Sequence, residues 1–479
     1  MAVESVLSWP SRRFKGRHAV VIGGSMAGLL ASRVLASHFE RVTLVERDRL
    51  APTSEPRKGV PQEQHAHGLL TKAVDILEGY FPGLFEQVLR EGASAVDMSE
   101  VSWFHFGNWQ ARALPGLLLY IQSRSLLDAV VRSRLPELEN LQLLGECEVV
   151  RPVANEARSA LRGLEVRRRG QQAVELLEAD LVVDASGRGS RMPRWLEELG
   201  LPRVEESHVR IDVGYASRMY RKPANLVANW KALSIYPTPP RETRMGALTQ
   251  VEGGRWLVSL AGSLGDHPPP DEAGFLEFAR GLPQPHLHAL LQRAEPLSPI
   301  AVHKFPSSMR RHYERLERLP EGLVVLGDAL CSFNPLYGQG ITLAAMAAST
   351  LDACLSAQPP GELSGLGRAF QRKAAQVLEL PWLMATGEDL LYPSVEGPRP
   401  WWWKRMQGYV NRLHARAAHD PVVSTAFAQM MHMTASPLLL VSPPLLMRAL
   451  RGGAAPGTPP VLQFTESTAE AGLPMVSAK

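Results

Sequence analysis

The stretch VVIGGSMAG (residues 20–28) decides the fold of this 479-residue chain, because it joins two kinds of hydrophobic pattern. The apolar run over 18–23 predicts a buried strand, and residues 26–39 carry apolar side chains at helical spacing. Residues 41–48, RVTLVERD, predict a second buried strand that ends in charge. A β-α-β unit of about 30 residues opens a doubly wound sheet. The sequence therefore predicts an α/β fold with a Rossmann-like first domain.

The glycine turn inside this stretch has the spacing of a dinucleotide fingerprint. Gly23, Ser25 and Gly28 take its three glycine positions, and Gly28 allows close packing of the helix against the strand. A pyrophosphate would lie at the helix N-terminus, where amide groups and the helix dipole favour negative charge. Glu46 ends the second strand, where an acid can bind ribose hydroxyls. The predicted dinucleotide site comprises Gly23, Ser25, Met26, Gly28, Glu46 and Arg47.

Two later apolar strands also run into glycine turns, ADLVVDASGRGS (179–190) and EGLVVLGDAL (321–330), and they are predicted to join the same sheet. Between them, extended segments and a hairpin at Gly253-Gly254 predict a β-rich insertion. The predicted division is a dinucleotide-binding domain in two parts (15–204 and 316–385), a β-rich substrate-binding insertion (205–315), a C-terminal helical unit (386–450) and a mobile tail (451–479).

The composition is that of an ordinary globular protein, with 45% apolar and 21% charged residues. A net charge of +4 is too small to mark a nucleic-acid binder. Three distant cysteines make no disulfide framework, which fits a reducing cytoplasm, and no secretory signal is visible. The apolar segment 437–450 is too short for a transmembrane helix. It predicts a buried helix pair, or else a surface that touches a membrane or an apolar substrate.

A second motif, GLVVLGDALCSFNPLYGQGITLAAMAAS, covers residues 322–349. Gly327 makes the turn after the strand, and Asp328 at the strand end can accept hydrogen bonds from a polyol chain. A helix that begins near Gly340 points free amides at an electron-rich ring edge, as the pyrimidine end of a flavin would present. The amides from Gly338 to Ile341 are the predicted donors.

These residues resemble the GD motif of the class A flavoprotein monooxygenases, the para-hydroxybenzoate hydroxylase-like group. Cys331 stands where many members have histidine. Arg124 in QSRSLLDAVV resembles the arginine of that family that reaches the cofactor, and ADLVVDASGRGSR resembles its third motif, with Ser186-Gly187 in place of Asp-Gly. Within the group, RKGVPQEQHAHGLL (57–70) and GDALCSFNPLYGQG most resemble the polyene epoxidases of lasalocid- and monensin-type polyether pathways.

The resemblance implies a glutathione-reductase-type FAD-binding domain and an FAD-dependent monooxygenase. It implies that FAD, reduced by NAD(P)H or by a separate flavin reductase, reacts with O2 to a C4a-hydroperoxide. One oxygen atom would then enter a large apolar substrate, with alkene epoxidation in natural-product biosynthesis as the leading reaction. Phe333, Asn334 and Pro335 are expected to wall the site, Gln62 and His67 to face the flavin, and Arg57 and Lys58 to contact the cofactor or an anion.

His65 and His67 without a nearby cluster of further ligands make a poor metal site, so no metal is predicted, and a packing role is expected for at least one of them. Several bulky side chains are candidates for lining the substrate site, with ordinary core packing as the alternative for the aromatic ones: Tyr215, Arg218, Trp230, Trp256 and the run 401–403.

Four other functions stay open. An aromatic-ring hydroxylase would use the same cofactor on a phenol. A flavin-dependent halogenase would carry a W-x-W-x-I-P signature, and PRPWWWKR (398–405) is not that pattern. A flavin dehydrogenase or reductase, or a non-catalytic flavin-containing binding protein, would share the fold, because the fold alone does not set the reaction. Peripheral membrane contact through 437–450 also remains an alternative, and the sequence predicts no oligomeric state.

Overall fold

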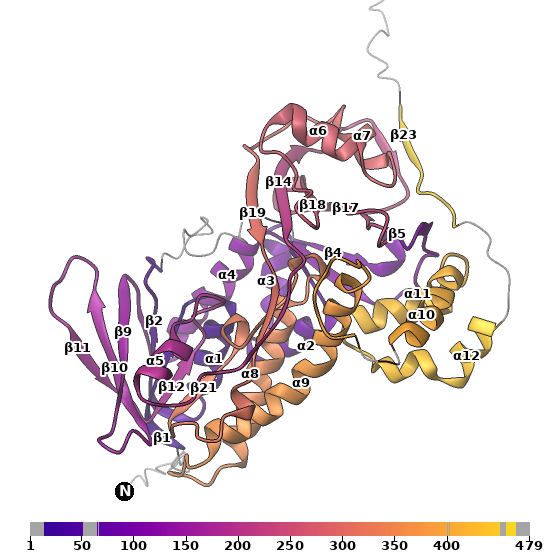
Figure 1. Cartoon of the computed structure of the whole chain (residues 1–479). Helices are drawn as coiled ribbons and strands as arrows, with labels where there is room; N and C mark the ends of the chain where they lie inside the picture. The colour runs from indigo at the N-terminus through magenta and orange to yellow at the C-terminus, as the bar shows by residue number, and fades with distance from the viewer. Residues whose placement is uncertain are drawn as a thin grey trace, which may run out of the picture.

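A computed structural model of the chain describes residues 14–50, 65, 67–399, 401, 403–450 and 457–465. Its centre is a five-stranded parallel sheet in the order β21-β12-β1-β2-β8 (Figure 1). The apolar runs that predicted β1, β2, β12 and β21 are buried, as expected for a parallel sheet covered on both faces, whereas β8 was not predicted. The strands are β1 (Gly16–Ile22), β2 (Phe39–Val45), β8 (Leu141–Leu144), β12 (Leu181–Asp184) and β21 (Leu323–Val325).

Helices and a β-meander cover the two faces of this sheet. The largest hydrophobic core joins the sheet to α1 (Met26–Leu35), α8 (Gly340–Ala357) and α9 (Leu366–Asp389). The meander lies on the other side in Figure 1 and consists of β9 (Cys147–Ala154), β10 (Leu161–Arg168) and β11 (Glu175–Glu178). Among the described residues, only α8 is long and apolar enough to cross a membrane, but 56% of it is buried inside the protein. We assign α8 to the core.

A second sheet of seven strands, in the order β19-β14-β18-β17-β16-β5-β6, stands above the first. Its β17–β18 hairpin turns at Gly253-Gly254, as predicted. The helices α6 (Glu272–Arg280) and α7 (His286–Leu291) cover its outer face. The strands are β5 (Val101–His105), β6 (Asn108–Trp109), β14 (Val213–Arg221), β16 (Ala232–Ile235), β17 (Arg244–Gln250), β18 (Arg255–Gly262) and β19 (Ala301–Phe305).

This sheet draws two of its strands from outside the predicted insertion (205–315). β5 and β6 come from within 15–204, yet β5 pairs in parallel with β16 and extends the sheet of the insertion. The reason is the pattern of residues 101–109, in which buried aromatic side chains such as Phe104 and Trp109 join the core under α6 and α7. The second sheet is therefore assembled from two separate parts of the chain.

Smaller elements connect these two bodies. A three-stranded sheet is formed by β3 (His67–Leu69), β7 (Leu118–Gln122) and β4 (Ser94–Asp97), and another by β13 (Glu206–Val209), β20 (Ser308–Arg311) and β22 (Cys331–Ser332). The remaining α-helices are α2 (Thr71–Tyr80), α3 (Leu84–Arg90), α4 (Arg124–Ser133), α5 (Met192–Glu198), α10 (Trp403–Ala417), α11 (Pro421–Met431) and α12 (Pro443–Leu450), with a 3-10 segment, η8 (Pro437–Val441), before α12.

The end of the chain differs from the predicted mobile tail. Within 457–465, β23 (Leu462–Phe464) pairs antiparallel with β15 (Leu226–Ala228). The indole Nε1 of Trp230 donates a hydrogen bond to the carbonyl of Val461 at 3.1 Å. The strand is held because Leu462 and Phe464 pack against the core beneath α6 and α7.

Candidate active site

The glycine turns after β1, β12 and β21 meet at one edge of the parallel sheet. A Cβ atom on Gly23 would lie 2.6 Å from the carbonyl oxygen of Ala185, which follows β12. A Cβ on Gly327 would lie 2.6 Å from the Cβ of Ala27 in α1. A Cβ on Gly28 would lie only 1.7 Å from the Gly23 carbonyl oxygen. The turns therefore touch although they are some 300 residues apart, and glycine is required where they meet.

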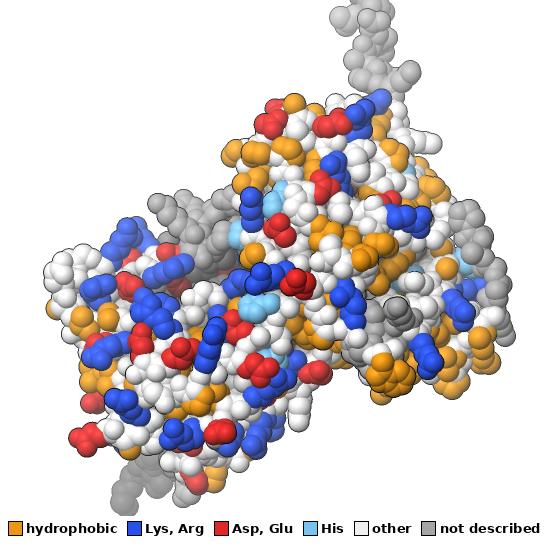
Figure 2. Space-filling view, in the orientation of Figure 1, with side chains coloured by type: hydrophobic (Ala, Val, Ile, Leu, Met, Phe, Trp, Pro, Cys, Tyr) orange, Lys and Arg blue, Asp and Glu red, His pale blue; other side chains and the backbone are white. Residues whose placement is uncertain are grey.

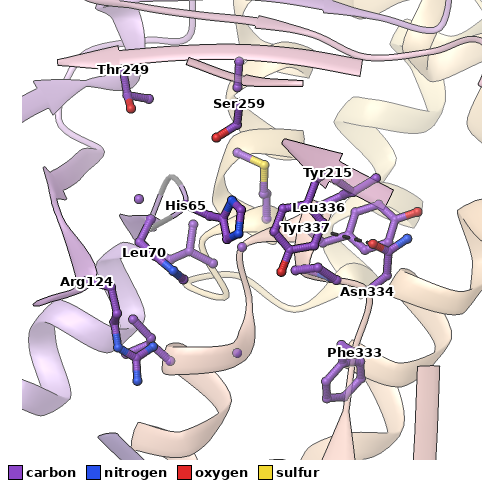
Figure 3. Close-up of a pocket in the computed structure, with 18 of the residues that line it drawn as sticks. His65, Leu70, Arg124, Tyr215, Thr249, Ser259, Phe333, Asn334, Leu336 and Tyr337 are labelled. Carbon is purple, nitrogen blue, oxygen red and sulfur yellow. Dashed lines mark hydrogen bonds between the residues drawn. The ribbon is translucent and has the colours of Figure 1, made fainter. Parts of the chain in front are cut away.

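A cavity of about 290 Å³ opens above these turns. In Figure 3, Arg124 and Phe333 lie toward the flavin-motif side, whereas Thr249 and Ser259 project from the second sheet across the cavity. We call this space the first chamber. The predicted site residues that line it are Ser25, Met26, His67, Arg124, Asp328, Phe333, Asn334, Pro335, Gly338, Gly340 and Ile341.

The other predicted residues within the described ranges do not line the chamber. Gly23, Gly28 and Gly327 shape the turns beneath it, and Arg47 is exposed beyond the end of β2. The predicted roles of Arg57, Lys58 and Gln62 lie outside the described residues.

Glu46 supports the fingerprint turn directly. Its Oε2 atom accepts a hydrogen bond from the Gly24 amide at 2.6 Å, and its Oε1 atom accepts one from the Asp48 amide at 2.9 Å. The carboxylate thus fixes the loop between β1 and α1, and it lies where the sequence placed an acid for ribose.

Glu46→Ala is expected to raise the Kd for FAD about tenfold, since hydrogen bonds to a charged group contribute about 1.5–3 kcal/mol. Titration of the flavin-free protein, followed by quenching of flavin fluorescence, measures this change. Glu40→Ala, an exposed residue near the start of β2, serves as the control and should leave the Kd unchanged. Equal affinities of Glu46→Ala and the wild type would contradict the role given to this carboxylate.

Arginine side chains surround the carboxylate of the second motif. Arg124 begins α4, and its Nε donates to Asp128 Oδ1 at 2.7 Å while Nη2 donates to Ser25 Oγ at 3.1 Å. Burial raises the pKa of Asp328, and the charges of Arg124 and Arg188 oppose that rise. The chamber floor therefore offers both a carboxylate acceptor and a held guanidinium donor to a polar chain.

The N-terminus of α8 also faces the chamber. Gly338 and Gly340 both line it, and a Cβ on either would meet no atom within 4 Å. The first amides of an 18-residue helix have no acceptor within the helix, and its dipole favours negative charge there. This end of the chamber can therefore receive a planar, electron-rich ring edge.

A buried carboxylate that sequence reasoning missed lies behind the GD motif. Asp389, at the end of α9, accepts hydrogen bonds on Oδ1 from Asn334 Nδ2 and from the Tyr337 hydroxyl, each at 3.0 Å. Burial raises the pKa of Asp389 to about 7, although both hydrogen bonds act in the opposite direction. The sequence around it, ATGEDLL (385–391), carries no pattern that distinguishes this acid from an exposed helical one.

Asp389→Asn is expected to gain stability over the wild type as the pH rises. The unfolded carboxyl has a pKa near 4, so between about pH 4 and pH 7 the folded state holds a proton that the unfolded state lacks. The stability of the wild type therefore falls as the pH rises from about 4 to about 7 and levels off above pH 7, whereas asparagine stays neutral. Urea unfolding at pH 5 and pH 8 should show the variant gaining about 2 kcal/mol relative to wild type. The exposed Asp75→Asn is the control, and an equal difference at both pH values would contradict the prediction.

Both histidines line the first chamber, but their surroundings differ. His65 is buried, its Nδ1 lies 2.8 Å from Ser217 Oγ, and its ring packs edge-on against Tyr215. Burial lowers the pKa of His65 to about 3, so it is a neutral packing residue at physiological pH. His67 begins β3 and lines the chamber. Across the described ranges, no group of three or more His, Cys, Asp or Glu side chains could hold a metal ion.

Of the predicted lining residues, Tyr215 does line the chamber, but Arg218, Trp230 and Trp256 do not. Alternate side chains of a strand face opposite sides of a sheet, so Tyr215 faces the chamber while Arg218 lies on the other face. Trp230 and Trp256 belong to the core under α6 and α7. Trp401 is 83% exposed, and the side chains of 402 and 403 lie outside what the structure describes. The missed lining residues are Met98, Val101, Trp103, Tyr236, Met245 and Met431.

Similarity to solved structures agrees with this architecture. The chain superposes on PqsL from Pseudomonas aeruginosa, described as a "probable FAD-dependent monooxygenase", with a TM-score of 0.58 and 15% identity, over 79% of this chain and 98% of PqsL. It superposes on a flavoprotein/dehydrogenase from Cytophaga hutchinsonii with a TM-score of 0.64 and 15% identity, over 90% and 96% of the two chains. The predicted α/β fold of FAD-binding monooxygenases is confirmed.

No model of a known protein family matches the sequence. A relative does match along almost its whole length: Protein Rv3254 of Mycobacterium tuberculosis (strain H37Rv) is 32% identical over 444 residues, which is 90% of this chain and 93% of the relative. The chain therefore belongs to the family of Protein Rv3254.

Proposed function

We propose that the protein is an FAD-dependent monooxygenase that transfers one oxygen atom from O2 to a large apolar substrate, most readily as an epoxide. The observation that carries this proposal is the close approach of the β21 turn at Gly327 to Ala27 in α1, the helix that follows the β1 turn. Both lie beneath a chamber whose opposite wall comes from the second sheet. A dinucleotide fingerprint and a GD motif meet at one place only if they bind the same extended cofactor.

The residues present fit FAD. The β1 turn and the start of α1 would hold the pyrophosphate, Glu46 lies at the adenosine end, and Asp328 with Arg124 would bind the ribityl and phosphate region. The amides of Gly340 and Ile341 would face the pyrimidine edge of the isoalloxazine ring. When bound and reduced, FAD supplies the activation of O2. The protein orients the cofactor and the substrate and excludes water.

The side of the chamber away from the flavin motifs supports an apolar substrate. Its walls include Met98, Val101, Trp103 and Met245, whose side chains offer contact area and no acid–base chemistry. Alkene epoxidation needs no base to deprotonate the substrate. Its balance is alkene, O2, NAD(P)H and a proton giving epoxide, water and NAD(P)+. The electron donor can equally be a flavin reduced by a separate reductase.

One observation favours aromatic-ring hydroxylation as the second candidate. Tyr337 lines the first chamber and donates its hydroxyl hydrogen to Asp389, whose pKa of about 7 suits a proton acceptor near neutral pH. A phenol bound beside Tyr337 could lose its proton along this route. The epoxidation and hydroxylation proposals therefore differ in whether Asp389 matters to the chemistry.

Isotope labelling tests the proposal. The FAD-loaded, reduced protein is exposed to 18O2 with a panel of apolar alkenes and a panel of phenols, and the products are analysed by mass spectrometry. One labelled oxygen atom in an epoxide supports the first candidate. A labelled phenol hydroxyl that is lost in Asp389→Asn supports the second. Substrate oxidation without label would instead indicate a dehydrogenase. A protein that stays colourless after incubation with FAD would overturn the whole proposal.

A further inference from the structure

A second, larger cavity lies beside the first chamber, beneath the C-terminal helices. Its volume is about 490 Å³, within the range that binds organic molecules of drug size. Its walls come from β5, α9, α10, α11 and η8, and they are mainly aliphatic, methionine and aromatic side chains. We call it the second chamber. Nothing in the flavin-binding machinery requires a cavity at this position.

The two chambers share a wall. Trp103, Tyr236, Tyr337 and Met431 line both of them. The Tyr236 hydroxyl donates to the carbonyl of Leu336 at 2.9 Å. With Tyr337 held by Asp389, hydrogen bonds fix both tyrosines of this wall. An elongated molecule that lies along both chambers would therefore pass beside Trp103 and Met431, the other two side chains of this wall.

The first chamber alone is small for a large substrate. Its volume of about 290 Å³ includes the space above Asp328 and the α8 N-terminus, where the flavin ring would lie. The second chamber adds more than the first contains. It also reaches the surface, because Leu438 of η8 lines it and is 75% exposed. Figure 2 shows hydrophobic side chains over the α12 region near this opening, where Met447 and Leu450 are exposed.

Polar atoms without partners mark one end of the second chamber. Gln339 lines it and is only 4% exposed, yet its Oε1 atom accepts no hydrogen bond within the described part of the chain. The Nδ1 atom of His105, also buried, has no partner there either, and its Nε2 lies 3.6 Å from Glu388 Oε2. A buried polar atom left unpaired costs about 1–3 kcal/mol. A ligand hydroxyl at this end would remove that cost.

We infer that the second chamber binds the distal part of the substrate, an elongated apolar chain that carries a hydroxyl group placed at Gln339. The assignment as substrate rests on the proposed monooxygenase function, whereas binding itself does not. The entry at Leu438 admits the molecule from the apolar surface, and its reacting end passes the shared wall to reach the flavin motifs.

Probe binding to the oxidised, FAD-loaded protein tests this inference without any turnover. Diphenylhexatriene, a rod-shaped apolar polyene, is titrated and its fluorescence followed. Val410→Trp on α10 fills the second chamber and is expected to raise the Kd of the probe at least tenfold. Leu383→Trp on α9 repeats the test from another wall. Val422→Trp, 39% exposed on α11 and outside the chamber, is the matched control and should change the Kd less than twofold.

Displacement of the probe by decanol and by decane tests the hydroxyl site. Gln339→Leu is expected to weaken decanol about fivefold and to leave decane within twofold, because one hydrogen bond contributes about 1 kcal/mol. Equal shifts for both competitors would overturn the hydroxyl assignment. If probe binding were unchanged in both tryptophan variants, the second chamber would not be a binding site. This conclusion would hold even if the protein oxygenates alkenes. If the probe binds as expected but the protein oxygenates no substrate, only the proposed monooxygenase function is contradicted.

Discussion

Asp328→Ala is expected to purify with less than about a tenth of the flavin found in the wild-type protein, with a Kd for FAD raised roughly 100-fold. Asp328 lies at the end of β21, and its carboxylate faces the first chamber beside Arg124. Hydrogen bonds from ligand hydroxyls to a desolvated carboxylate are among the strong ones, at about 1.5–3 kcal/mol each. Two such bonds from a polyol chain account for the expected loss. The ratio of flavin absorbance to protein absorbance measures it.

Asp328→Ala is expected to fold normally, so a loss of flavin can be assigned to weaker binding and not to unfolding. Burial raises the pKa of Asp328, so the folded chain gains nothing from the charge when no ligand is bound. The flavin-free variant is therefore expected to unfold at the same temperature as the flavin-free wild type, or higher. Asp328→Asn keeps one acceptor oxygen and should bind FAD with intermediate affinity. A yellow, fully loaded Asp328→Ala protein would refute the role assigned to this residue.

Gly28→Ala is expected to destabilise the protein by about 3 kcal/mol or more and to abolish flavin binding. The added methyl group would lie 1.7 Å from the Gly23 carbonyl oxygen, which is backbone and cannot rotate away. Overpacking of a tight site costs about 1–3 kcal/mol, and more where backbone must move. Moving α1 away from β1 would also pull Ala27 from the Gly327 turn. Thermal unfolding with and without FAD measures both effects.

Gly79→Ala is the matched control for that substitution. Gly79 lies inside α2, and a Cβ there would meet no atom within 4 Å. Alanine is favoured over glycine in a helix interior by up to about 1 kcal/mol, so this variant should be slightly more stable than the wild type. If Gly28→Ala and Gly79→Ala behaved alike, close packing of α1 against β1 would not explain the glycine at position 28.

The sequence predicted the sites where local chemistry is strict. Gly23 and Gly28 can hardly be replaced because backbone approaches backbone there, and Gly327 has a positive φ and lies against the Cβ of Ala27. Such constraints are visible as a motif. Four of the five strands of the parallel sheet could be found because they are continuous apolar runs, whereas β8, which contains Gln142, was missed. Ser25 and Asp328 followed from their positions after those runs, whereas Arg124 followed only from the family resemblance, and the structure brings all three to one chamber.

Features that depend on contacts between residues far apart in the chain could not be predicted from the sequence. The pairing of β5 with β16 and of β23 with β15 depends on register across more than 100 residues. Arg218 was wrongly predicted to line the chamber because side chains alternate between the two faces of β14. The sequence pattern did not show at which residue β14 starts, so it did not show which side chains face the chamber. Asp389 could not be recognised because its raised pKa arises from burial beside Asn334 and Tyr337.

The position of β21 at the edge of the parallel sheet also has a consequence for biosynthesis. β1, β2, β8 and β12 leave the ribosome first, but the strand that carries Asp328 follows only after the whole second sheet has been made. More than 130 residues are translated between Asp184 and Leu323, and during this time the edge of β12 has no partner strand. Cofactor capture must come late and cannot guide the early steps.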